Sequence, residues 1–388
     1  LKECSPSFAL PLKLIFELSL SSGKIPDIWR LANVTPIFKK GSRLDPSNYR
    51  PISLTSIPCK IMETIIKQST MAHFYENQLL SLEQHGFVPR RACNTNLIES
   101  VDMATSLTDR GHAVDIIFLD FAKAFDKVSH HKLVIKLHSM GISGHLLDWF
   151  SDFLRARRQR VVLGEHTSDW IDVTSGVPQG SVLGPTLFIA YVNDLPRAII
   201  NVSKLYADDC KIIAKVDSEK DYNILQSDLD SISNWCSIWD MELSDMKCRV
   251  MHIGRKNPKF TYKLSHGNAS YTQLATTNEE RDLGIILSSN LKFSSQAAFA
   301  ASKANSMLGM LKNAFTSRDT ELWTSLYKTY IRPHLEFAAP AWNPYLKRDK
   351  LVIEKVQRRV TRIPAPLREL DYSTRLNAMG LTSLETRR

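Results

Sequence analysis

The stretch V-D-I-I-F-L-D at residues 114–120 determines the fold class more than any other part of the sequence. It is apolar at nearly every position except Asp115, a pattern typical of a strand buried on both faces. Two further β-prone runs, 204–207 and 210–216, are separated by Asp208-Asp209. They predict a hairpin with two acidic residues at its tip. If the strand and the hairpin are neighbours in one sheet, three carboxylates lie at one edge of that sheet.

Three carboxylates at one edge have a direct electrostatic consequence. Carboxylates held close together raise each other's pKa unless a cation neutralises them. Oxygen ligands without histidine or cysteine favour Mg²⁺ or Mn²⁺ over zinc. Two such ions about 4 Å apart can activate a 3′-hydroxyl and stabilise the leaving oxygen of a phosphoryl transfer. Each acidic site also has an ordinary alternative, because Asp is common in turns and after strands. The residues alone leave both interpretations open.

Composition and charge narrow the class of protein. The chain has 388 residues, of which 43% are hydrophobic and 23% charged, which is typical of a globular protein with two or three subdomains. A net charge of +10 favours a polyanionic partner, either nucleic acid or an acidic membrane surface. The longest apolar run, near 183–192, is too short to span a membrane. We therefore expect no membrane association and an intracellular location, in the nucleus, the cytoplasm or both.

The ends of the chain and its cysteines add two expectations. The sequence begins at Leu1 and shows no secretory leader, so we expect a piece of a longer reading frame without a signal peptide. The six cysteines are widely scattered and form no C-x-x-C pair. This spacing disfavours a zinc site and predicts free thiols in a reducing compartment.

Helices and strands are expected to be mixed along the whole chain. The predicted helices are Leu10–Leu20, 60–75, a helix from Ser129 to about Met140, Gly144–Leu154 after a Ser143 cap, and Asp221–Trp239. The predicted strands besides those above are Trp29–Lys39, Arg157–Leu163, Cys248–Ile253 and Arg281–Leu287. After about Leu291 the chain becomes helical and more basic, and we place a subdomain boundary there.

Three strings, in a fixed order, resemble reverse transcriptase motifs. F-L-D-F-A-K-A-F-D-K-V at 118–128 resembles the first catalytic motif of these enzymes, and Y-A-D-D at 206–209 resembles the second. Between them, S-G-V-P-Q-G-S-V-L-G-P at 175–185 is similar to a loop-and-helix motif of non-LTR retrotransposon enzymes. A lone Y-A-D-D is a weak signal, but three such strings in this order are specific.

The resemblance extends over nearly the whole chain. N-Y-R-P-I-S-L at 48–54 resembles the fingers motif, and 235–254 resembles the motif that follows the Asp-Asp hairpin. R-D-L-G-I at 281–285 resembles a primer-grip strand, and the tail at 305–384 is similar to the C-terminal region of jockey-like and chicken-repeat-like LINE polymerases. The chain is therefore identified as a member of the non-LTR, LINE-type reverse transcriptases.

This resemblance implies an α+β right-hand polymerase of fingers, palm and thumb, with an antiparallel palm sheet packed on helices. Fingers and palm would occupy 1–290, with the core motifs at about 33–254, and 291–388 would form a helical, basic thumb. The implied activity is that of an RNA-directed DNA polymerase, with an RNA template, a DNA primer or target, deoxynucleoside triphosphates and two Mg²⁺ or Mn²⁺ ions. An endonuclease would lie upstream in the complete element.

The resemblance also implies a role for individual residues. Asp120 and Asp208 would be the principal metal ligands, with Asp209 less directly bound, and Phe121 would adjoin both metal and substrate. The residues implied in the nucleotide site are Arg50 and Lys39 or Lys40 on the triphosphate, Gln179 and Gly180 against the base or sugar, and Phe125 as a steric gate. Lys247 would protonate the leaving pyrophosphate. Core packing for Phe125 and a plain exposed lysine for Lys247 are the alternatives.

Two basic clusters could contact the backbone of a template–primer duplex. The first consists of Arg155, Arg157, Arg158 and Arg160; the second consists of Lys347, Arg348, Lys350, Lys355, Arg358, Arg359 and Arg362. Charged runs are also common on solvated helix faces. Two positions depart from the family pattern, since Cys210 stands where many relatives have Thr and Asp245 where Asn is usual. A catalytically silent, retrotransposon-derived nucleic-acid-binding protein is the alternative function, and an intron maturase is disfavoured by the LINE-like tail.

Overall fold

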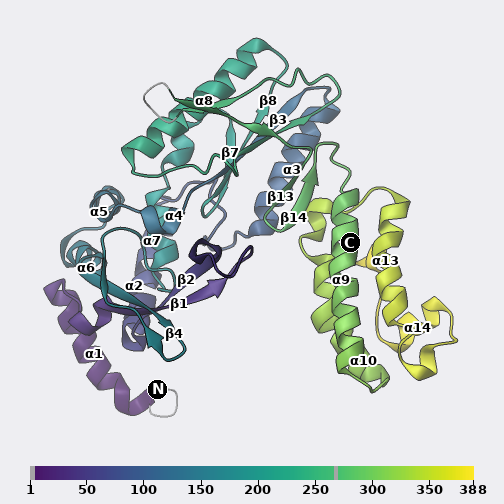
Figure 1. Cartoon of the computed structure of the whole chain (residues 1–388), viewed down its shortest axis with the longest axis horizontal. Helices are drawn as coiled ribbons and strands as arrows, with labels where there is room; N and C mark the ends of the chain where they lie inside the picture. The colour runs from purple at the N-terminus through teal and green to yellow at the C-terminus, as the bar shows by residue number, and fades with distance from the viewer. Residues whose placement is uncertain (1–4, 266–269) are drawn as a thin grey trace.

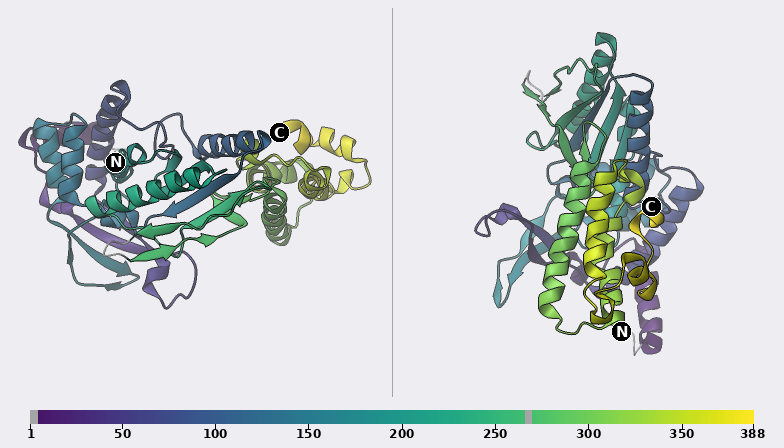
Figure 2. Two further views of the ribbon diagram at one scale, coloured as in Figure 1. Left: turned by 90° about the horizontal axis from the view of Figure 1, so that it is seen from above. Right: turned by 90° about the vertical axis from the view of Figure 1, so that its right-hand side faces the viewer.

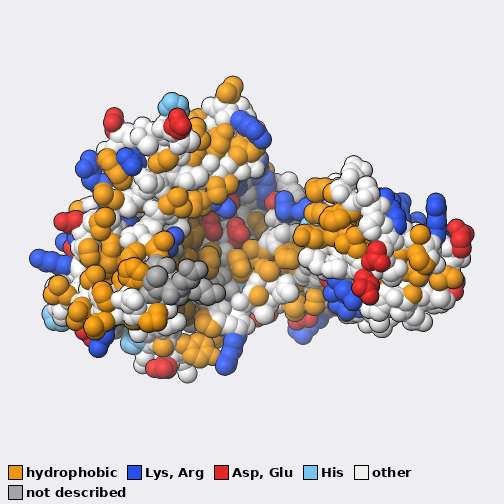
Figure 3. Space-filling model, turned by 90° about the horizontal axis from the view of Figure 1, so that it is seen from below, with side chains coloured by type: hydrophobic (Ala, Val, Ile, Leu, Met, Phe, Trp, Pro, Cys, Tyr) orange, Lys and Arg blue, Asp and Glu red, His pale blue; other side chains and the backbone are white. Residues whose placement is uncertain are grey.

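The computed structural model describes residues 5–265 and 270–388. A larger lobe contains most of the strands, and a helical lobe formed by the C-terminal part of the chain lies beside it (Figures 1 and 2). Seen from below, a hollow separates the two lobes, and acidic side chains are visible inside it (Figure 3).

The larger lobe is organised around β3 (Val114–Asp120), the central strand of a five-stranded sheet. β8 (Asp209–Lys215) and β9 (Arg249–Ile253) flank it, both antiparallel to it. β7 (Val202–Tyr206) pairs with β8, and β12 (Ala275–Thr276) runs parallel to β9 at the other edge. The predicted neighbourhood of the buried strand and the acidic hairpin is therefore confirmed.

Both faces of β3 are covered, which explains its continuous apolar run. Ile117 and Leu119 join one core together with residues of helices α5 (His130–Ser139), α7 (Gly184–Tyr191) and α8 (Glu219–Ile238). Their neighbours Val114 and Ile116 join a second core with residues of α3 (Cys93–Asp109) and the C-terminal helices. Since successive strand side chains point to opposite faces, a strand in this position needs apolar residues throughout.

A second sheet lies in the N-terminal part of the larger lobe. β1 (Leu31–Phe38) pairs antiparallel with β2 (Tyr49–Leu54) and parallel with β4 (Arg157–Leu163). The remaining elements of this part are β5 (His166–Thr167), β6 (Ile171–Val173), α1 (Ser5–Ser22), α2 (Ile57–Glu76), α4 (Ala124–Lys127) and α6 (Gly144–Leu154). Two of its helices, α1 and α6, pack against each other.

The C-terminal lobe begins after two short hairpins. These are β10 (Lys263–Ser265) with β11 (Tyr271–Gln273), and β13 (Glu279–Asp282) with β14 (Ile285–Ser288). The helices that follow are α9 (Ser294–Ala314), α10 (Thr320–Leu326), a π-helical turn at 327–331, α11 (Arg332–Glu336), α12 (Ala339–Trp342), α13 (Lys347–Val360), α14 (Tyr372–Ala378) and α15 (Leu384–Arg387). Their core is continuous with one side of the central sheet.

Two local expectations, one about a strand and one about helix caps, differ from the structure. The predicted single strand Arg281–Leu287 is instead the β13–β14 hairpin, because Leu283 and Gly284 both have positive φ and reverse the chain. Ser129 and Ser143 occupy N-cap positions, but neither side chain makes a capping hydrogen bond. Five cysteines are free thiols, as predicted; Cys4 lies outside the described residues.

Candidate active site

The acidic hairpin and the end of β3 meet at one edge of the central sheet. In the strand register, Asp120 lies opposite Asp209, and Tyr206 lies opposite Asp209 on the other side. The loop of this hairpin is therefore only two residues, Ala207 and Asp208. Ala207 has φ +57°, a left-handed conformation that two-residue hairpin loops require and that glycine usually supplies. The loop thus places Asp208 at the tip of the hairpin. The expectation of two acidic residues at the tip is wrong for Asp209, which is the first residue of β8 because it pairs with Tyr206.

The protein environment disfavours the charged form of two of these carboxylates. Burial raises the pKa of Asp208, and the negative charge of Asp120 raises it further. Burial raises the pKa of Asp209 to about 6, with additional contributions from Asp208, Asp282 and Asp120. The residue as a whole remains exposed to solvent. An added cation would relieve this repulsion.

Lys247 lies directly against the first aspartate. Its Nζ donates to Asp120 Oδ1 at 2.7 Å. The turn that carries this lysine is fixed to the end of β3, because Ser244 N donates to Asp120 O at 2.8 Å and Lys247 N donates to Ser244 O at 2.8 Å. Phe121 forms an isolated bridge with Leu243 beside this turn. The chain therefore supplies one cation of its own to the acidic edge.

A cleft of about 1220 Å³ opens in front of the aspartates and is bounded by both sheets of the larger lobe. Its lining includes most of the residues predicted from the sequence: Lys39, Arg50, Asp120, Phe121, Phe125, Gln179, Gly180, Asp208, Asp209 and Lys247. Lys40 instead lines a neighbouring cavity of about 370 Å³, together with Asp209 and Asp282. Of the two lysines left open by the sequence, only Lys39 therefore shares the cleft with Arg50.

The glycine-flanked loop is bonded to the strand that carries Arg50. Ser53 N donates to Gln179 O at 2.7 Å, and Gln179 Nε2 donates to Asp126 Oδ1 at 2.8 Å. Gly180 has φ +119°, and a Cβ there would lie 2.5 Å from Ser53 O. Only glycine permits this close approach of the loop to β2. The loop is thus held as part of the cleft wall.

The surroundings of Phe125 fit both roles considered for it, a steric gate at the nucleotide and a packing residue of the core. It lies on the short helix α4 and lines the cleft. Its ring also stacks on Phe188 of α7, with ring centroids 4.4 Å apart and planes 16° apart. The ring is therefore held rigidly from behind while one part of it faces the cleft.

Glu63 is a buried acid that the sequence analysis did not single out. It lies in α2 and is completely buried, and its Oε2 accepts from Val182 N at 2.7 Å and Leu183 N at 3.0 Å. Burial raises the pKa of Glu63, while these two backbone donors lower it. It therefore anchors the start of α7, behind the Gln179 loop. A single glutamate in an amphipathic helix gives no sequence signal for such a contact.

One expectation about the basic clusters is wrong. Arg157 is only 2% exposed, donates to Phe153 O at 3.1 Å and packs over the Phe153 ring. It is the first residue of a half-buried strand and faces the core, so it cannot contact a duplex. Arg155 and Arg158 are exposed, as are six of the seven cations of the second cluster on and just after α13. Lys350, the remaining one, pairs with Glu385.

The acidic edge is not a preformed metal cage. Within residues 5–265 and 270–388, no group of three or more His, Cys, Asp or Glu side chains converges on a common metal position. The three aspartates nevertheless share one edge and line one cleft, as the sequence suggested. In the same part of the chain no helix is long and apolar enough to cross a membrane.

Comparisons with known proteins agree with this geometry. Residues 37–293 match the family described as "Reverse transcriptase (RNA-dependent DNA polymerase)". The "RNA-directed DNA polymerase from mobile element jockey" of Drosophila funebris is 27% identical over 386 residues, covering 93% of this chain and 41% of that protein. The "Probable RNA-directed DNA polymerase from transposon X-element" of Drosophila melanogaster is 25% identical, covering 91% of this chain and 40% of that protein. The chain thus spans about two fifths of the length of these relatives.

Among solved structures, apo telomerase from Candida tropicalis has the same fold. It superposes with a TM-score of 0.53 at 11% sequence identity, covering 96% of this chain and 64% of that one. This likeness confirms the predicted α+β right-hand polymerase fold. Because the family match covers well over half of the sequence, the chain belongs to the reverse transcriptase (RNA-dependent DNA polymerase) family.

Proposed function

We propose that this chain is the RNA-directed DNA polymerase of a non-LTR retrotransposon and adds deoxynucleotides to the 3′-hydroxyl of a primer. The observation that carries the proposal is the arrangement at the sheet edge. Asp120 and Asp209 lie opposite each other, Asp208 lies at the hairpin tip, and all three face one cleft with Arg50 and Gln179. In this reading 1–290 form the fingers and palm, and 291–388 form the thumb.

The donor set fits a hard divalent cation. Its donors are carboxylate oxygens, and burial and mutual repulsion disfavour the charged forms of Asp208 and Asp209 in the absence of a cation. Mg²⁺ is usually bound by one or two carboxylates together with substrate phosphates and water, so a closed protein cage is not required. Asp120 and Asp208 would hold the ions, with Asp209 beside them. When bound, two such ions supply charge stabilisation to the attacking and leaving oxygens.

The cationic residues of the cleft would act on the triphosphate. Arg50 is exposed on β2, where its guanidinium can bind phosphate oxygens in a bidentate manner, and Lys39 follows the end of the paired strand β1. Lys247 carries protons at the acidic edge and can deliver one to a leaving pyrophosphate. Its ion pair with Asp120 holds it at the reacting end of the cleft.

The walls of the cleft would select and orient the nucleotide. The Gln179 loop is fixed to both β2 and the α4 region, so its side chain has a defined position against a base or sugar. The Phe125 ring is held by Phe188 and presents a rigid surface at the same cleft. A bulky ring below the sugar would clash with a 2′-hydroxyl and favour deoxynucleotides.

The helical lobe would bind the duplex product through its exposed cations. Six phosphate contacts from such cations would lower the affinity roughly a thousandfold between 50 and 200 mM salt. Template binding with a much weaker salt dependence would contradict this assignment.

Primer extension tests the proposal. We expect the protein to extend a DNA primer on an RNA template with deoxynucleotides and Mg²⁺, and we expect Asp208→Asn to abolish extension. Equal incorporation by both proteins would refute the metal assignment. Tight template binding by the wild-type protein without any incorporation would favour the catalytically silent nucleic-acid-binding alternative.

A further inference from the structure

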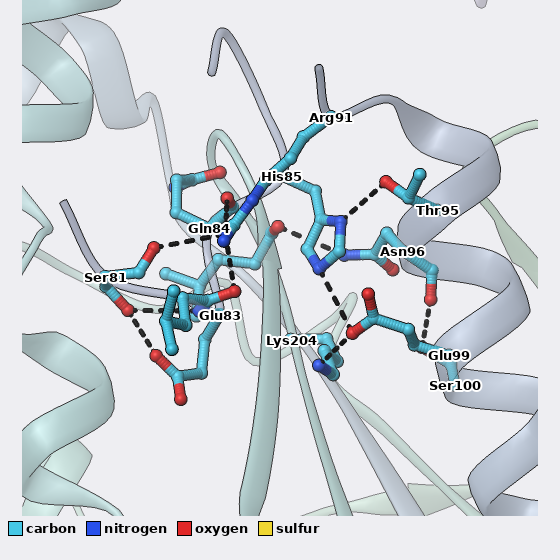
Figure 4. Close-up of polar contacts among 12 residues, drawn as sticks. Ser81, Glu83, Gln84, His85, Arg91, Thr95, Asn96, Glu99, Ser100 and Lys204 are labelled. Atoms are coloured by element: carbon cyan, nitrogen blue, oxygen red, sulfur yellow. Dashed lines mark hydrogen bonds and ion pairs between the residues drawn. The ribbon is translucent and has the colours of Figure 1, made fainter. Parts of the chain in front are cut away.

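The segment that precedes α3 lies directly on the catalytic hairpin. Gln84, which is labelled in Figure 4, forms a parallel bridge with Leu205, the residue before the Y-A-D-D string. His85 N donates to Leu205 O at 2.8 Å, and Leu205 N donates to Glu83 O at 2.9 Å. This short segment therefore pairs with the outer side of β7, at the edge of the central sheet.

The side chain of Gln84 reaches the loop of the hairpin. Its Oε1 accepts from Ala207 N at 2.9 Å and from Gly86 N at 2.7 Å. The residue is only 1% exposed, and its Nε2 makes no hydrogen bond within the described part of the chain. Two backbone N–H groups can be satisfied only by an acceptor, so the oxygen of this amide is the functional atom. It bonds the one loop residue that has a left-handed backbone.

Gly86 brings the same segment into unusually close contact with the loop. A Cβ at position 86 would lie 2.4 Å from Ala207 N and 3.0 Å from Tyr206 C. Any larger residue would displace the backbone of the hairpin. We call Gln84 and Gly86 the clamp: Gln84 supplies the acceptor oxygen, and Gly86 allows the segment to approach the hairpin loop closely.

The segment itself is held in place from both sides. Arg91 Nη1 donates to Ser81 O at 3.2 Å, Leu82 O at 2.5 Å and Gln84 O at 2.8 Å. On the other side, the Nδ1 of His85 lies 2.8 Å from Thr95 Oγ1 of α3, and Asn96 Nδ2 of the same helix donates to Leu205 O of β7 at 3.0 Å. These bonds tie the segment to its own turn and to α3, and Figure 4 shows them around Arg91 and His85.

We propose that Gln84 is a positioning residue of the polymerase centre. By bonding Ala207 N it fixes the strained loop and, through it, the position of Asp208. This inference rests on the proposed function, because Asp208 is taken as a metal ligand. Partners one step behind a ligand typically contribute about 10–100-fold to metal affinity or activity. A small displacement of the ligand has an effect of similar size, of about 10²-fold for 1 Å.

Gln84→Met removes the acceptor at nearly constant size, and Gln357→Met is its matched control. Gln357 is a second completely buried glutamine, located in α13, whose amide contacts Tyr327, Tyr372 and Thr382 O. Both variants lose buried hydrogen bonds, so both are expected to melt at a lower temperature. Only the loss at position 84 should reach the catalytic hairpin.

Three measurements on the full chain separate the two variants. Hydrogen exchange of peptides covering 202–210 should speed up about tenfold or more in Gln84→Met and stay unchanged in Gln357→Met. Mn²⁺ affinity, measured by electron paramagnetic resonance, should fall about 10–100-fold only in Gln84→Met. The kcat for single-nucleotide incorporation should fall similarly, with KM for the deoxynucleotide changed much less. Gln84→Glu keeps the acceptor and should recover most of the kcat, whereas Gly86→Ala should resemble Gln84→Met.

The outcomes also separate this inference from the proposed function. The role of Gln84 would be overturned if the hairpin of Gln84→Met exchanged its amide hydrogens as slowly as the wild type does. It would also be overturned if the two methionine variants lowered Mn²⁺ affinity equally. An inactive wild-type protein would refute the proposed function, and the hydrogen-exchange comparison would still decide whether Gln84 fixes the loop.

Discussion

The two ends of β3 each carry an aspartate, and the two aspartates have opposite surroundings. Asp115, near the start of the strand, is completely buried and accepts from three side chains: His252 Nδ1 at 2.7 Å, Asn257 Nδ2 at 2.8 Å and Tyr262 Oη at 2.5 Å. Asp120, at the other end, has a side chain that is 33% exposed and one charged partner, Lys247.

The difference shows how the surroundings of an acid decide its role. The oxygens of Asp115 are saturated by donors of the protein, so nothing is left for a ligand to bind. At the Asp120 end, the neighbours are two further aspartates whose pKa values are raised by burial and repulsion. Charge that the protein leaves uncompensated is available to a cation, and this is why only one end of the strand is a candidate active site.

Asp208→Asn should have the largest effect at the cleft end. It removes a proposed ion ligand, and we expect the incorporation rate to fall at least about a thousandfold, because metal-ion charge stabilisation is worth several kcal/mol. Stability should stay equal or rise, since the substitution removes a half-buried carboxylate that repels its neighbours. Single-turnover extension and thermal melting measure the two effects. A rate within about tenfold of wild type would contradict the difference between the two ends.

Lys247→Met tests the cation that pairs with Asp120 at the same end. Loss of a general acid typically lowers the rate by about 10²–10⁴-fold, and we expect a loss near the lower end of that range. Lys247→Arg is the matched control, because it keeps the charge beside Asp120 but cannot deliver a proton at neutral pH. Proton delivery would be contradicted if the arginine variant kept more than about half of the rate of incorporation.

Asp115→Ala tests the other end of β3, where the protein itself supplies all the hydrogen-bond donors to the aspartate. It leaves His252, Asn257 and Tyr262 without their buried acceptor, and the free energy of unfolding should fall by about 3–5 kcal/mol. Denaturant unfolding at pH 7 measures the loss. The rate of incorporation per folded molecule should remain within about threefold of wild type. A selective loss of activity without a loss of stability would mean that this end also serves the reaction.

The smallest expected effect concerns Lys136. Like Asp115, it is a buried ionisable residue whose partners are supplied by the protein itself. Its Nζ lies 3.6 Å from the centroid of the Trp239 ring and pairs with Asp194. Burial lowers the pKa of Lys136 to about 8. Between about pH 8 and 10.5 the unfolded chain therefore binds more protons at this site than the folded one, so this group makes stability rise with pH across that window and adds no slope below it.

The difference in unfolding free energy between wild type and Lys136→Met isolates this contribution. The difference should shift in favour of wild type by roughly 3 kcal/mol in total across the window, with more than half of the shift between pH 8 and 9.5. If the difference in unfolding free energy did not change with pH, Lys136 would be solvated in the folded protein, unlike Asp115.

Strongly patterned segments could be predicted from the sequence. The continuous apolar run of β3 and the acidic hairpin were sufficient to suggest three carboxylates at one sheet edge. The register could not be predicted: the loop is Ala207 and Asp208, and Asp209 begins β8 opposite Asp120. Burial of a charged residue could not be predicted: Arg157 has the same sequence context as its exposed neighbours but turns inward. The role proposed for Gln84 depends on a contact across more than a hundred residues, which one sequence does not reveal.

The residue roles at the cleft remain predictions, and the most direct test is the position of a metal ion. Crystals of the protein with an RNA–DNA primer–template, a deoxynucleotide and Mn²⁺ can be measured at the manganese absorption edge. We predict anomalous peaks within about 2.2 Å of carboxylate oxygens of both Asp120 and Asp208, a distance typical of such small hard cations. Ordered substrate in the cleft with no peak at these two aspartates would contradict the account.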